Sequence, residues 1–520
     1  MAALLSLGLA AAVVFLAPRG MDFAAHLYQR TLFLQHGFRL WNNHWYAGRY
    51  SFVGYSLLYY PLAAVFGIAA LAIASIVGAV AAFALVVERQ WGASARPAAF
   101  AFAVVWPITA VTGALPFLLG STFALAALVA LQRKRNIAFA VLALLSLFSS
   151  PLAFAFLALV SVAAAVGGRE RRFAAPALAL GLAFAVEVVL TRLFPAGGNF
   201  PFPWTTLLGA LAFAVIGAGL SWKESRLLRA LFLVYGVACL VAFAIPSELG
   251  ANVVRLRFVA LPLTVLVLAL RRFRPRIAAV AALLLASAWS LTPLGTAIVQ
   301  AADDPSASSA YWRPAVTFLQ QHLTASYRVE AVATADHWEA LYLPRAGIPI
   351  ARGWFRQDDL PQNELLYKPL QPKAYLDWLR SLGVRYVLLT DAPLDYSAKR
   401  EARLLKSGRA GLPVVRRFAH AVVYAVPSPR ELVSGPAPAH IRRFGDTNVR
   451  LNVAAPGTYR LAFRYSSYWT PSSGCLARRA DGMTDLTVAH AGSVTLTFAT
   501  SVNGALGMLD GRRRSCAETG

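Results

Sequence analysis

The sequence predicts a polytopic α-helical membrane protein of about eleven spans, followed by an extracytoplasmic α/β unit and a C-terminal β-sandwich. Hydrophobic types make up 58% of the 520 residues and charged types only 14%, whereas soluble domains carry about 25% charged residues. Apolar runs alternate with short polar breaks up to about residue 298. Beyond that point the pattern is that of water-soluble domains. We therefore expect three domains, at 1–298, 299–429 and 430–520.

The first domain is predicted from apolar runs that approach the length of a membrane span, about 20 residues. We expect spans at roughly 3–18, 57–87, 97–112, 114–131, 137–149, 151–167, 173–190, 204–220, 227–245, 258–270 and 277–297. Several of these runs are short, so broken or re-entrant helices are expected among them.

The orientation follows from basic side chains, which gather in alternate loops at residues 89–96, 133–135, 169–172, 223–229 and 271–276. The positive-inside rule places such loops in the cytoplasm. The N-terminus is then cytoplasmic, and the first loop, residues 19–56, lies outside together with everything after residue 298. We expect a multi-pass protein of the bacterial plasma membrane. The formal charge of +25 is explained by these loops, so no nucleic-acid partner is expected.

The second domain is predicted from helical and strand patterns that alternate. Arg328–Thr334 and Val384–Thr390 read as strands, and Gln371–Leu382 between them has helical spacing that ends before Gly383. Alternating helices and strands are typical of a small α/β unit.

The third domain, from about residue 430, consists of stretches that alternate apolar and polar residues, punctuated by Pro and Gly. This pattern favours a small β-sandwich or jelly-roll. Cys475 and Cys516 both fall in this part of the chain, and an oxidising compartment would join them in a disulfide.

The first outer loop contains the most informative polar residues. Asp22 and His26 are spaced four apart, so they share one face of a helix just outside the first span. The Asp22 carboxylate would act as a general base toward an acceptor hydroxyl, or bind a divalent ion together with His26. The alternative is that Asp22 starts an interfacial helix and His26 faces lipid headgroups. Trp45 and Tyr46 belong either to the interfacial aromatic belt or to a platform that stacks on sugar rings.

The residues of this loop resemble those of the multi-spanning GT-C glycosyltransferase superfamily, especially the bacterial membrane proteins of the 6-pyruvoyl-tetrahydropterin-synthase-related group. The resemblance is carried by Asp22, His26, Gly37, Trp41, Trp45-Tyr46-Ala47-Gly48 and Tyr60-Pro61-Leu62. It implies about eleven spans, an extracytoplasmic C-terminal domain and a polyprenyl-phosphate sugar as donor. It also implies that Asp22 is the catalytic base or a metal ligand, with His26 as its neighbour.

A second candidate site in the membrane domain contains Asn252, Arg255 and Arg257. Two arginines at an outer membrane edge run against the positive-inside trend. Because an arginine fork binds phosphate bidentately and stays charged, these residues are predicted to hold the phosphate of a lipid-linked donor. The alternatives are a lipid-headgroup anchor or an ion pair with Glu248.

A third cluster lies in the α/β domain, where acidic, basic and aromatic residues concentrate within about thirty positions. We predict acceptor contacts from Asp336, His337, Trp338, Glu339 and Arg356. Carboxylates would bond sugar hydroxyls, and Trp would stack on the apolar face of a ring. The alternative is a polar interface between domains. The sequence has no P-loop, Rossmann glycine pattern or serine elbow, so a nucleotide-dependent cytoplasmic reaction is unsupported.

Taken together, these features predict an enzyme that moves a sugar from a polyprenyl-phosphate donor to a cell-envelope glycan or lipid-linked acceptor on the outer face. Two other classes stay open. A lipid or glycolipid transporter or flippase is compatible with Glu187 inside an apolar run. A non-catalytic envelope glycan-binding protein would use only the outer β unit. A divalent cation at Asp22 and His26 is the one cofactor considered.

Overall fold

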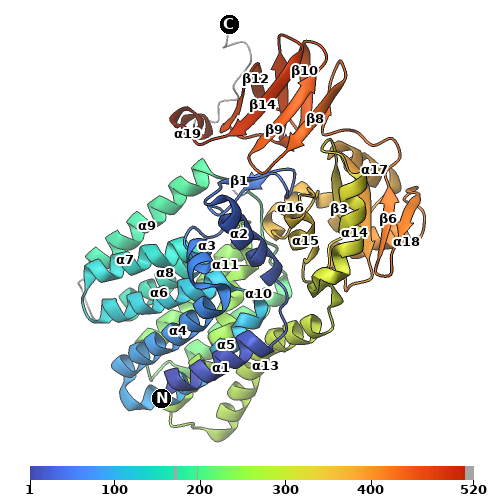
Figure 1. Cartoon of the computed structure of the whole chain (residues 1–520). Helices are drawn as coiled ribbons and strands as arrows, with labels where there is room; N and C mark the ends of the chain where they lie inside the picture. The colour runs from blue at the N-terminus through green and yellow to red at the C-terminus, as the bar shows by residue number, and fades with distance from the viewer. Residues whose placement is uncertain (169–172, 196, 510–520) are drawn as a thin grey trace. The chain divides into compact units, whose positions relative to one another are not determined.

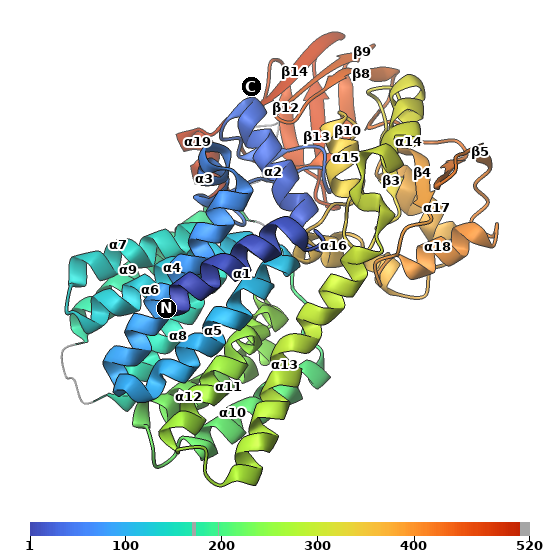
Figure 2. The same cartoon turned by 60° about the horizontal axis from the view of Figure 1, so that its bottom comes forward.

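A computed structural model describes residues 1–168, 173–195 and 197–509, which form two compact units (Figures 1 and 2). Unit 1 comprises residues 1–26, 55–189 and 198–303. Unit 2 comprises residues 27–54 and 190–197 and the chain from residue 304 onward. The predicted basic loop at 169–172 and the predicted disulfide partner Cys516 lie outside the described residues. The three predicted domain ranges stay a prediction.

Unit 1 is built from α-helices joined by short turns. Its helices are α1 Ala2–Leu16, α3 Tyr59–Phe66, α4 Ile68–Trp91, α5 Arg96–Ile108, α6 Leu115–Gln132, α7 Asn136–Ser149, α8 Pro151–Gly167, α9 Ala174–Leu193, α10 Trp204–Leu220, α11 Arg226–Ala244, α12 Ala260–Leu270 and α13 Arg276–Ala302. Short 3₁₀ helices η1 Gly92–Ala95, η2 Thr109–Thr112 and η3 Gly250–Val259 connect some of them. The last four residues of α9, 190–193, belong to unit 2.

Six helical stretches in the described part of the chain are long and apolar enough to cross a membrane, and four apolar helices are shorter. Each of the eleven predicted spans coincides with helical structure, although the number that crosses a membrane stays a prediction. The run predicted at 57–87 is not one helix. Gly67, with φ +79°, breaks it into α3 and α4, because this left-handed conformation ends a right-handed helix.

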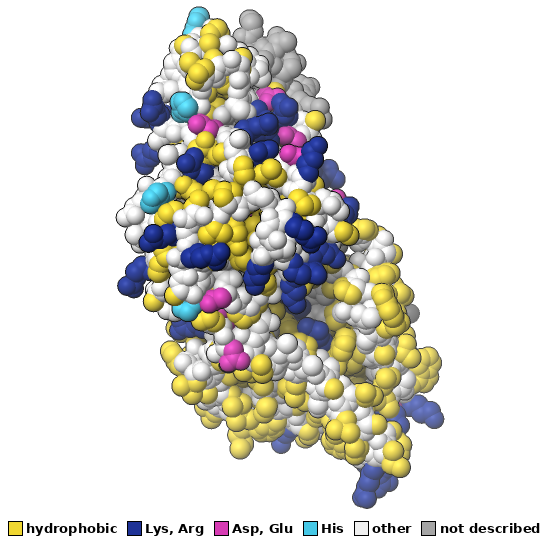
Figure 3. All heavy atoms as spheres, turned by 90° about the vertical axis from the view of Figure 1, so that its right-hand side faces the viewer, with side chains coloured by type: hydrophobic (Ala, Val, Ile, Leu, Met, Phe, Trp, Pro, Cys, Tyr) yellow, Lys and Arg dark blue, Asp and Glu magenta, His cyan; other side chains and the backbone are white. Residues whose placement is uncertain are grey.

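The helices of unit 1 pack through small residues, as membrane helices do. A Cβ atom on Gly78 of α4 would lie 2.8 Å from Thr122 of α6, and one on Gly120 of α6 would lie 2.8 Å from Ala153 of α8. Large apolar side chains such as Leu178 and Leu182 of α9 are exposed instead. In Figure 3 hydrophobic side chains cover much of the surface of unit 1, and Lys and Arg gather at its lower end. The chain is a multi-pass membrane protein whose outward apolar surface faces lipid.

Unit 2 contains a four-stranded sheet in the order β3-β4-β6-β5, flanked by helices. The strands are β3 Arg328–Ala331, β4 Val384–Thr390, β5 Val414–Arg417 and β6 Ala421–Ala425, and only the β3–β4 pair is parallel. The helices are α14 Ser309–His322, α15 Glu339–Arg345, α16 Arg356–Gln362, α17 Pro372–Ser381 and α18 Lys399–Lys406, with η4 Pro305–Ala307 and η5 Glu364–Tyr367. Tyr375 and Leu379 of α17 pack on Val384 and Val387 of the sheet, which confirms the predicted α/β unit.

The C-terminal part of unit 2 has two antiparallel four-stranded sheets, ordered β12-β13-β10-β7 and β11-β14-β9-β8. The strands are β7 Val433–Ser434, β8 Ala439–Phe444, β9 Asn448–Val453, β10 Gly457–Arg464, β11 Trp469–Pro471, β12 Cys475–Arg478, β13 Met483–Val488 and β14 Gly492–Phe498, followed by α19 Val502–Leu509. Alternate residues of both sheets, including Leu451, Leu461, Leu486 and Leu496, meet in one core. The predicted β-sandwich is confirmed.

The first loop forms part of the core of unit 2. It contributes α2 Phe23–His36, β1 Trp41–Asn42 and β2 Arg49–Tyr50. The Trp41 ring stacks on Phe498 of the sandwich with centroids 5.0 Å apart. Ala47 belongs to the core of the α/β sheet, and its carbonyl accepts a hydrogen bond from Arg464 N at 2.7 Å. This segment therefore joins both parts of unit 2, which the sequence alone did not reveal.

Because Trp41 is buried in the core of the sandwich, we expect Trp41→Ala to lower the free energy of unfolding of unit 2 by about 3–5 kcal/mol. The measurement is the thermal midpoint of the purified protein in detergent, with limited proteolysis reporting on unit 2. Trp204→Ala is the matched control, because the Trp204 side chain is exposed. Equal midpoints for the two variants would contradict the packing described here.

Candidate active site at the start of helix α2

Asp22 lies directly before α2 and is held by the turn that precedes α6. The Asp22 main-chain nitrogen donates a hydrogen bond to the Thr112 carbonyl at 3.4 Å. Gly113 has φ +71°, and a Cβ atom there would lie 2.7 Å from the main-chain nitrogen of Phe23. This close approach requires glycine, so the turn sets where Asp22 and the start of α2 lie.

The Asp22 carboxylate forms an ion pair with Arg255. The distance from Arg255 Nη2 to Asp22 Oδ2 is 3.7 Å, and the two side chains are 25% and 16% exposed. Tyr55 adds a hydroxyl that hydrogen-bonds Arg255. The Arg255 guanidinium also lies 5.9 Å from the centre of the Phe117 ring. Residues from four separate segments of unit 1 thus surround a partly exposed carboxylate and guanidinium.

Arg255 is positioned by η3, an unusually long 3₁₀ helix of ten residues. Its C-terminal end is fixed by Ser290, whose hydroxyl donates to the Arg257 carbonyl at 2.8 Å and accepts from Leu261 N at 3.1 Å. Since side chains three apart lie one above the other in a 3₁₀ helix, Asn252 and Arg255 share one face. Arg257 lies on another face, with its guanidinium 5.6 Å from the Phe258 ring centre.

His26 is fully buried one turn after Asp22, among three tyrosines of the loop and α3. Its Nδ1 lies 3.1 Å from the Tyr60 hydroxyl, and the rings of Tyr55, Tyr59 and Tyr60 have centroids 5.7–6.0 Å away. Desolvation by burial lowers the pKa of His26 to about 3, against a smaller upward effect of the main-chain hydrogen bond with Gly113. The imidazole is therefore neutral at physiological pH, and it anchors α2 rather than exchanging protons.

These contacts do not fit a divalent cation at Asp22 and His26. The Asp22 carboxylate is paired with the Arg255 guanidinium, whose positive charge would repel a metal ion. The described ranges also contain no group of three or more His, Cys, Asp or Glu side chains that could hold a metal.

The predicted acceptor residues lie in unit 2, where several of them form buried hydrogen bonds within the protein. Glu339 Oε2 accepts from the Thr334 hydroxyl at 2.6 Å, and Glu339 Oε1 lies 3.2 Å from His337 Nδ1. Burial lowers the pKa of His337, but its hydrogen bond to Glu339 and the charges of Glu339 and Asp395 outweigh burial and raise the pKa overall. Asp336 is also fully buried.

Arg356 is tied to the same region by an ion pair. Its two terminal nitrogens donate to the two oxygens of Asp395 at 3.1 and 2.7 Å. Burial raises the pKa of Asp395, but the charges of His337 and Arg356 and hydrogen bonds to Arg356 and Ser397 hold it well below its ordinary value. The Arg356 guanidinium also donates to the Tyr367 hydroxyl at 2.8 Å. The Arg356 guanidinium and the Asp395 carboxylate are thus held in a network of hydrogen bonds within the protein.

The aromatic residues predicted to stack on sugar are core residues in this structure. The Trp45 indole donates to the Ala340 carbonyl at 3.0 Å, and the Tyr46 hydroxyl donates to the Phe355 carbonyl at 2.9 Å. Both side chains, and that of Trp338, are at most 2% exposed. A buried ring offers no open face, so we do not assign sugar stacking to these three residues.

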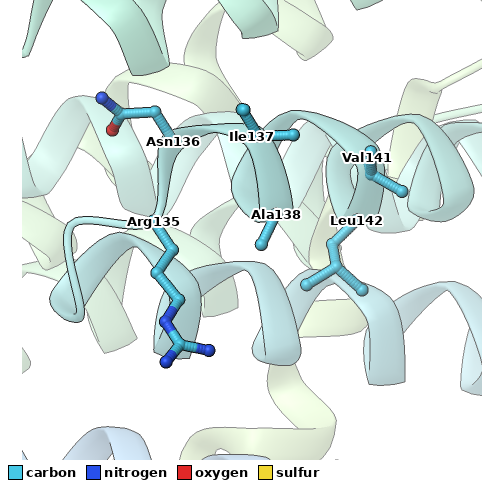
Figure 4. A pocket seen from close by; sticks show the side chains of 6 residues that line it. All are labelled: Arg135, Asn136, Ile137, Ala138, Val141 and Leu142. Atoms are coloured by element: carbon cyan, nitrogen blue, oxygen red, sulfur yellow. The ribbon is translucent and has the colours of Figure 1, made fainter.

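Tyr55 and Phe117 lie beside Arg255 but were not predicted from the sequence. The ion pair between Asp22 and Arg255 was not predicted either. No local pattern identifies them, because they come from separate segments. A surface hollow lies elsewhere, at the start of α7 (Figure 4). It measures about 710 Å³ and is lined by Arg135, Asn136, Ile137, Ala138, Val141 and Leu142. None of the predicted site residues lines it.

Comparisons with known proteins identify structural likeness only. No family model matches the chain, and no curated protein matches it. The crystal structure of apo ArnT from Cupriavidus metallidurans is 16% identical, with a TM-score of 0.38 over 82% of this chain and 98% of that chain. ArnT from the same organism bound to undecaprenyl phosphate is 15% identical, with a TM-score of 0.38 over 81% and 97%.

The neutral, buried His26 makes stability depend on pH. As the pH falls below 6.5 the unfolded chain takes up a proton at His26, whereas the folded protein does not do so until about pH 3. The stabilising contribution is therefore complete above pH 6.5 and is lost progressively as the pH falls toward 3, by up to about 1.4 kcal/mol per pH unit.

We expect His26→Gln to remove this component, so that its thermal midpoint falls less steeply than that of the wild type between pH 7 and pH 4. Thermal unfolding in detergent across that range measures the effect. His490→Gln is the control, because His490 is exposed. Parallel curves for wild type and His26→Gln would show that His26 titrates normally.

Proposed function

We propose that this protein is a membrane glycosyltransferase that moves a sugar from a polyprenyl-phosphate donor to an acceptor hydroxyl of a cell-envelope glycan or lipid. The observation that carries the proposal is the partly exposed ion pair between Asp22 and Arg255. It combines a carboxylate, which can accept a proton, with a guanidinium, which can bind phosphate, in a unit whose outer surface faces lipid.

Arg255 is the proposed phosphate ligand. Its 3.7 Å distance to Asp22 is longer than the 2.7–2.9 Å of a charge-assisted hydrogen bond, so the pair is loosely engaged. A guanidinium has five N–H donors and can bind two phosphate oxygens while it keeps its contact with Tyr55. Asn252, on the same face of η3, supplies an amide for a further phosphate oxygen. Arg257 is assigned only a supporting positive charge.

Asp22 is the proposed general base. When the donor phosphate engages Arg255, it competes with the carboxylate for the guanidinium and leaves Asp22 able to accept a proton. The acceptor oxygen then forms a bond to the sugar C1 as its proton passes to Asp22. The bond between C1 and the phosphate oxygen breaks, and its electron pair leaves with the polyprenyl phosphate. His26, held against Tyr60, keeps α2 and therefore Asp22 in place.

The proposed topology places this site on the outer face, with a cytoplasmic N-terminus and unit 2 outside, as the basic loops predict. The acceptor contacts predicted for residues 336–339 and Arg356 stay a prediction. Their buried hydrogen bonds add no support to it.

The proposal predicts that Asp22→Asn lowers sugar transfer by about 10²-fold or more, because removal of a general base costs that much. The assay measures transfer of labelled sugar from a polyprenyl-phosphate donor to a membrane extract by protein in lipid nanodiscs. Glu88→Gln, at an exposed carboxylate, is the control. Full transfer by Asp22→Asn would reject the role of Asp22, and altered lipid movement with no transfer in any variant would favour a flippase.

Arg255→Gln should weaken binding of undecaprenyl phosphate by about tenfold or more, because it removes a charge-assisted bidentate contact. Arg255→Lys keeps the charge but not the fork and should recover only part of the binding. Native mass spectrometry measures lipid occupancy in each variant. Arg19→Gln, at an exposed arginine close in sequence to Asp22, is the control. Unchanged occupancy in Arg255→Gln would exclude Arg255 as the phosphate ligand.

A further inference from the structure

Arg328 is a fully buried arginine whose side chain has no described partner. It is the first residue of β3, and its main-chain nitrogen donates to the Gly383 carbonyl at 2.9 Å. The side chain is 0% exposed. Within the described ranges, Nε, Nη1 and Nη2 all lack a hydrogen-bond partner. An uncompensated buried charge costs several kcal/mol, so a native fold that retains one requires a counter-ion.

Two further arginines lie close to Arg328, on strand β10. A ladder of main-chain hydrogen bonds brings the chain before β3 beside the middle of β10. Leu432 N donates to the Ser326 carbonyl at 2.8 Å, and Ala462 N donates to the Leu432 carbonyl at 2.7 Å. Arg460 precedes Ala462 by two residues on this strand, and Arg464 follows it by two.

Burial and, to a smaller extent, the positive charges of Arg464 and Arg460 together lower the pKa of Arg328 to about 9. The three guanidinium groups therefore interact with one another. At neutral pH Arg328 still carries its charge, since this pKa lies above 7. The cluster thus concentrates positive charge in one buried region of unit 2.

The acidic groups around this cluster are already engaged. Asp481 Oδ2 pairs with Arg460 Nη2 at 3.1 Å and also with Arg479 at 3.7 Å. Asp358 pairs with Arg49 at 2.7 Å. Arg464 donates to two neutral oxygens, the Gln362 side chain at 3.1 Å and the Asp481 carbonyl at 3.3 Å.

The two arginines of β10 also offer N–H groups for further hydrogen bonds. Arg460 Nη1 and Arg464 Nε are buried and have no hydrogen-bond partner in the part of the chain that the structure describes. Together with the three nitrogens of Arg328, these atoms are buried cationic donors that no acceptor among the described residues satisfies. Guanidinium donors bind the oxygens of phosphate-type anions well.

We propose that Arg328, Arg460 and Arg464 bind a phosphate oxyanion, at a site separate from the one at Asp22. The oxyanion is either a free phosphate ion or the phosphate group of a larger envelope molecule, since both present the same oxygens. The Arg460 side chain keeps 12% exposure and marks the side from which the anion enters. A bound anion bridges β3 of the α/β sheet and β10 of the sandwich and so stabilises unit 2.

The test measures the thermal midpoint of the full-length protein in detergent as inorganic phosphate replaces chloride at constant ionic strength. We expect the midpoint to rise with phosphate in the wild type. We expect Arg328→Met to weaken the apparent phosphate affinity by about tenfold or more, because it removes the central donor. In chloride alone, Arg328→Met should be at least as stable as the wild type, because an apolar side chain then replaces an unpaired buried charge.

Arg450→Gln is the matched control, because Arg450 is an exposed arginine of the same sandwich, and it should keep the full phosphate effect. If Arg328→Met does not fold, Arg464→Met provides the same comparison. A second series with glycerol 1-phosphate distinguishes the two sources. A shift with both compounds indicates a phosphate group carried on a larger molecule, and a shift with inorganic phosphate alone indicates a free ion. The proposal would be overturned if phosphate did not raise the midpoint of the wild type. It would also be overturned if phosphate raised the midpoints of Arg328→Met and Arg464→Met as much as that of the wild type.

Discussion

The ion pair between Asp22 and Arg255 is the interaction on which the functional interpretation depends. It places an acidic residue of the first loop beside a guanidinium that a long 3₁₀ helix carries, although more than two hundred residues separate them in the chain. A carboxylate near a guanidinium stays ionised, and a loosely held pair can exchange partners when a phosphate arrives. The supporting contacts have a structural purpose, because Gly113 and the neutral His26 determine where α2 begins.

The first loop has a second role that is separate from this chemistry. Residues 27–54 supply Trp41 to the core of the sandwich and Ala47 to the core of the α/β sheet. Trp45 and Tyr46, which look like a sugar platform in the sequence, are used for the same purpose. Apolar burial of large aromatic rings stabilises strongly, so a loop rich in Trp and Tyr is well suited to join two substructures.

Buried charge is handled in two different ways in unit 2. Arg356 and Asp395 pair with each other through two hydrogen bonds, which offsets the cost of desolvation. Around Arg328 three arginines meet without a matching number of free carboxylates. Both regions lie in unit 2, and the same electrostatics applies to the charges in each. The Arg356–Asp395 pair is satisfied within the protein, whereas the arginines around Arg328 are the proposed anion site.

Hydrophobic runs and alternating patterns were sufficient to predict the helical membrane unit, the α/β sheet and the sandwich, because these depend on the local period of apolar residues. The strand Val384–Thr390 and the helix within Gln371–Leu382 could be read directly from that period. Asp22 and Arg255 were both candidates from residue type alone. Their pairing, the burial of Trp45 and Tyr46, and the unpartnered Arg328 were decided only by tertiary structure. Contacts between residues far apart in the chain depend on how elements pack, and no local pattern in the sequence records that packing.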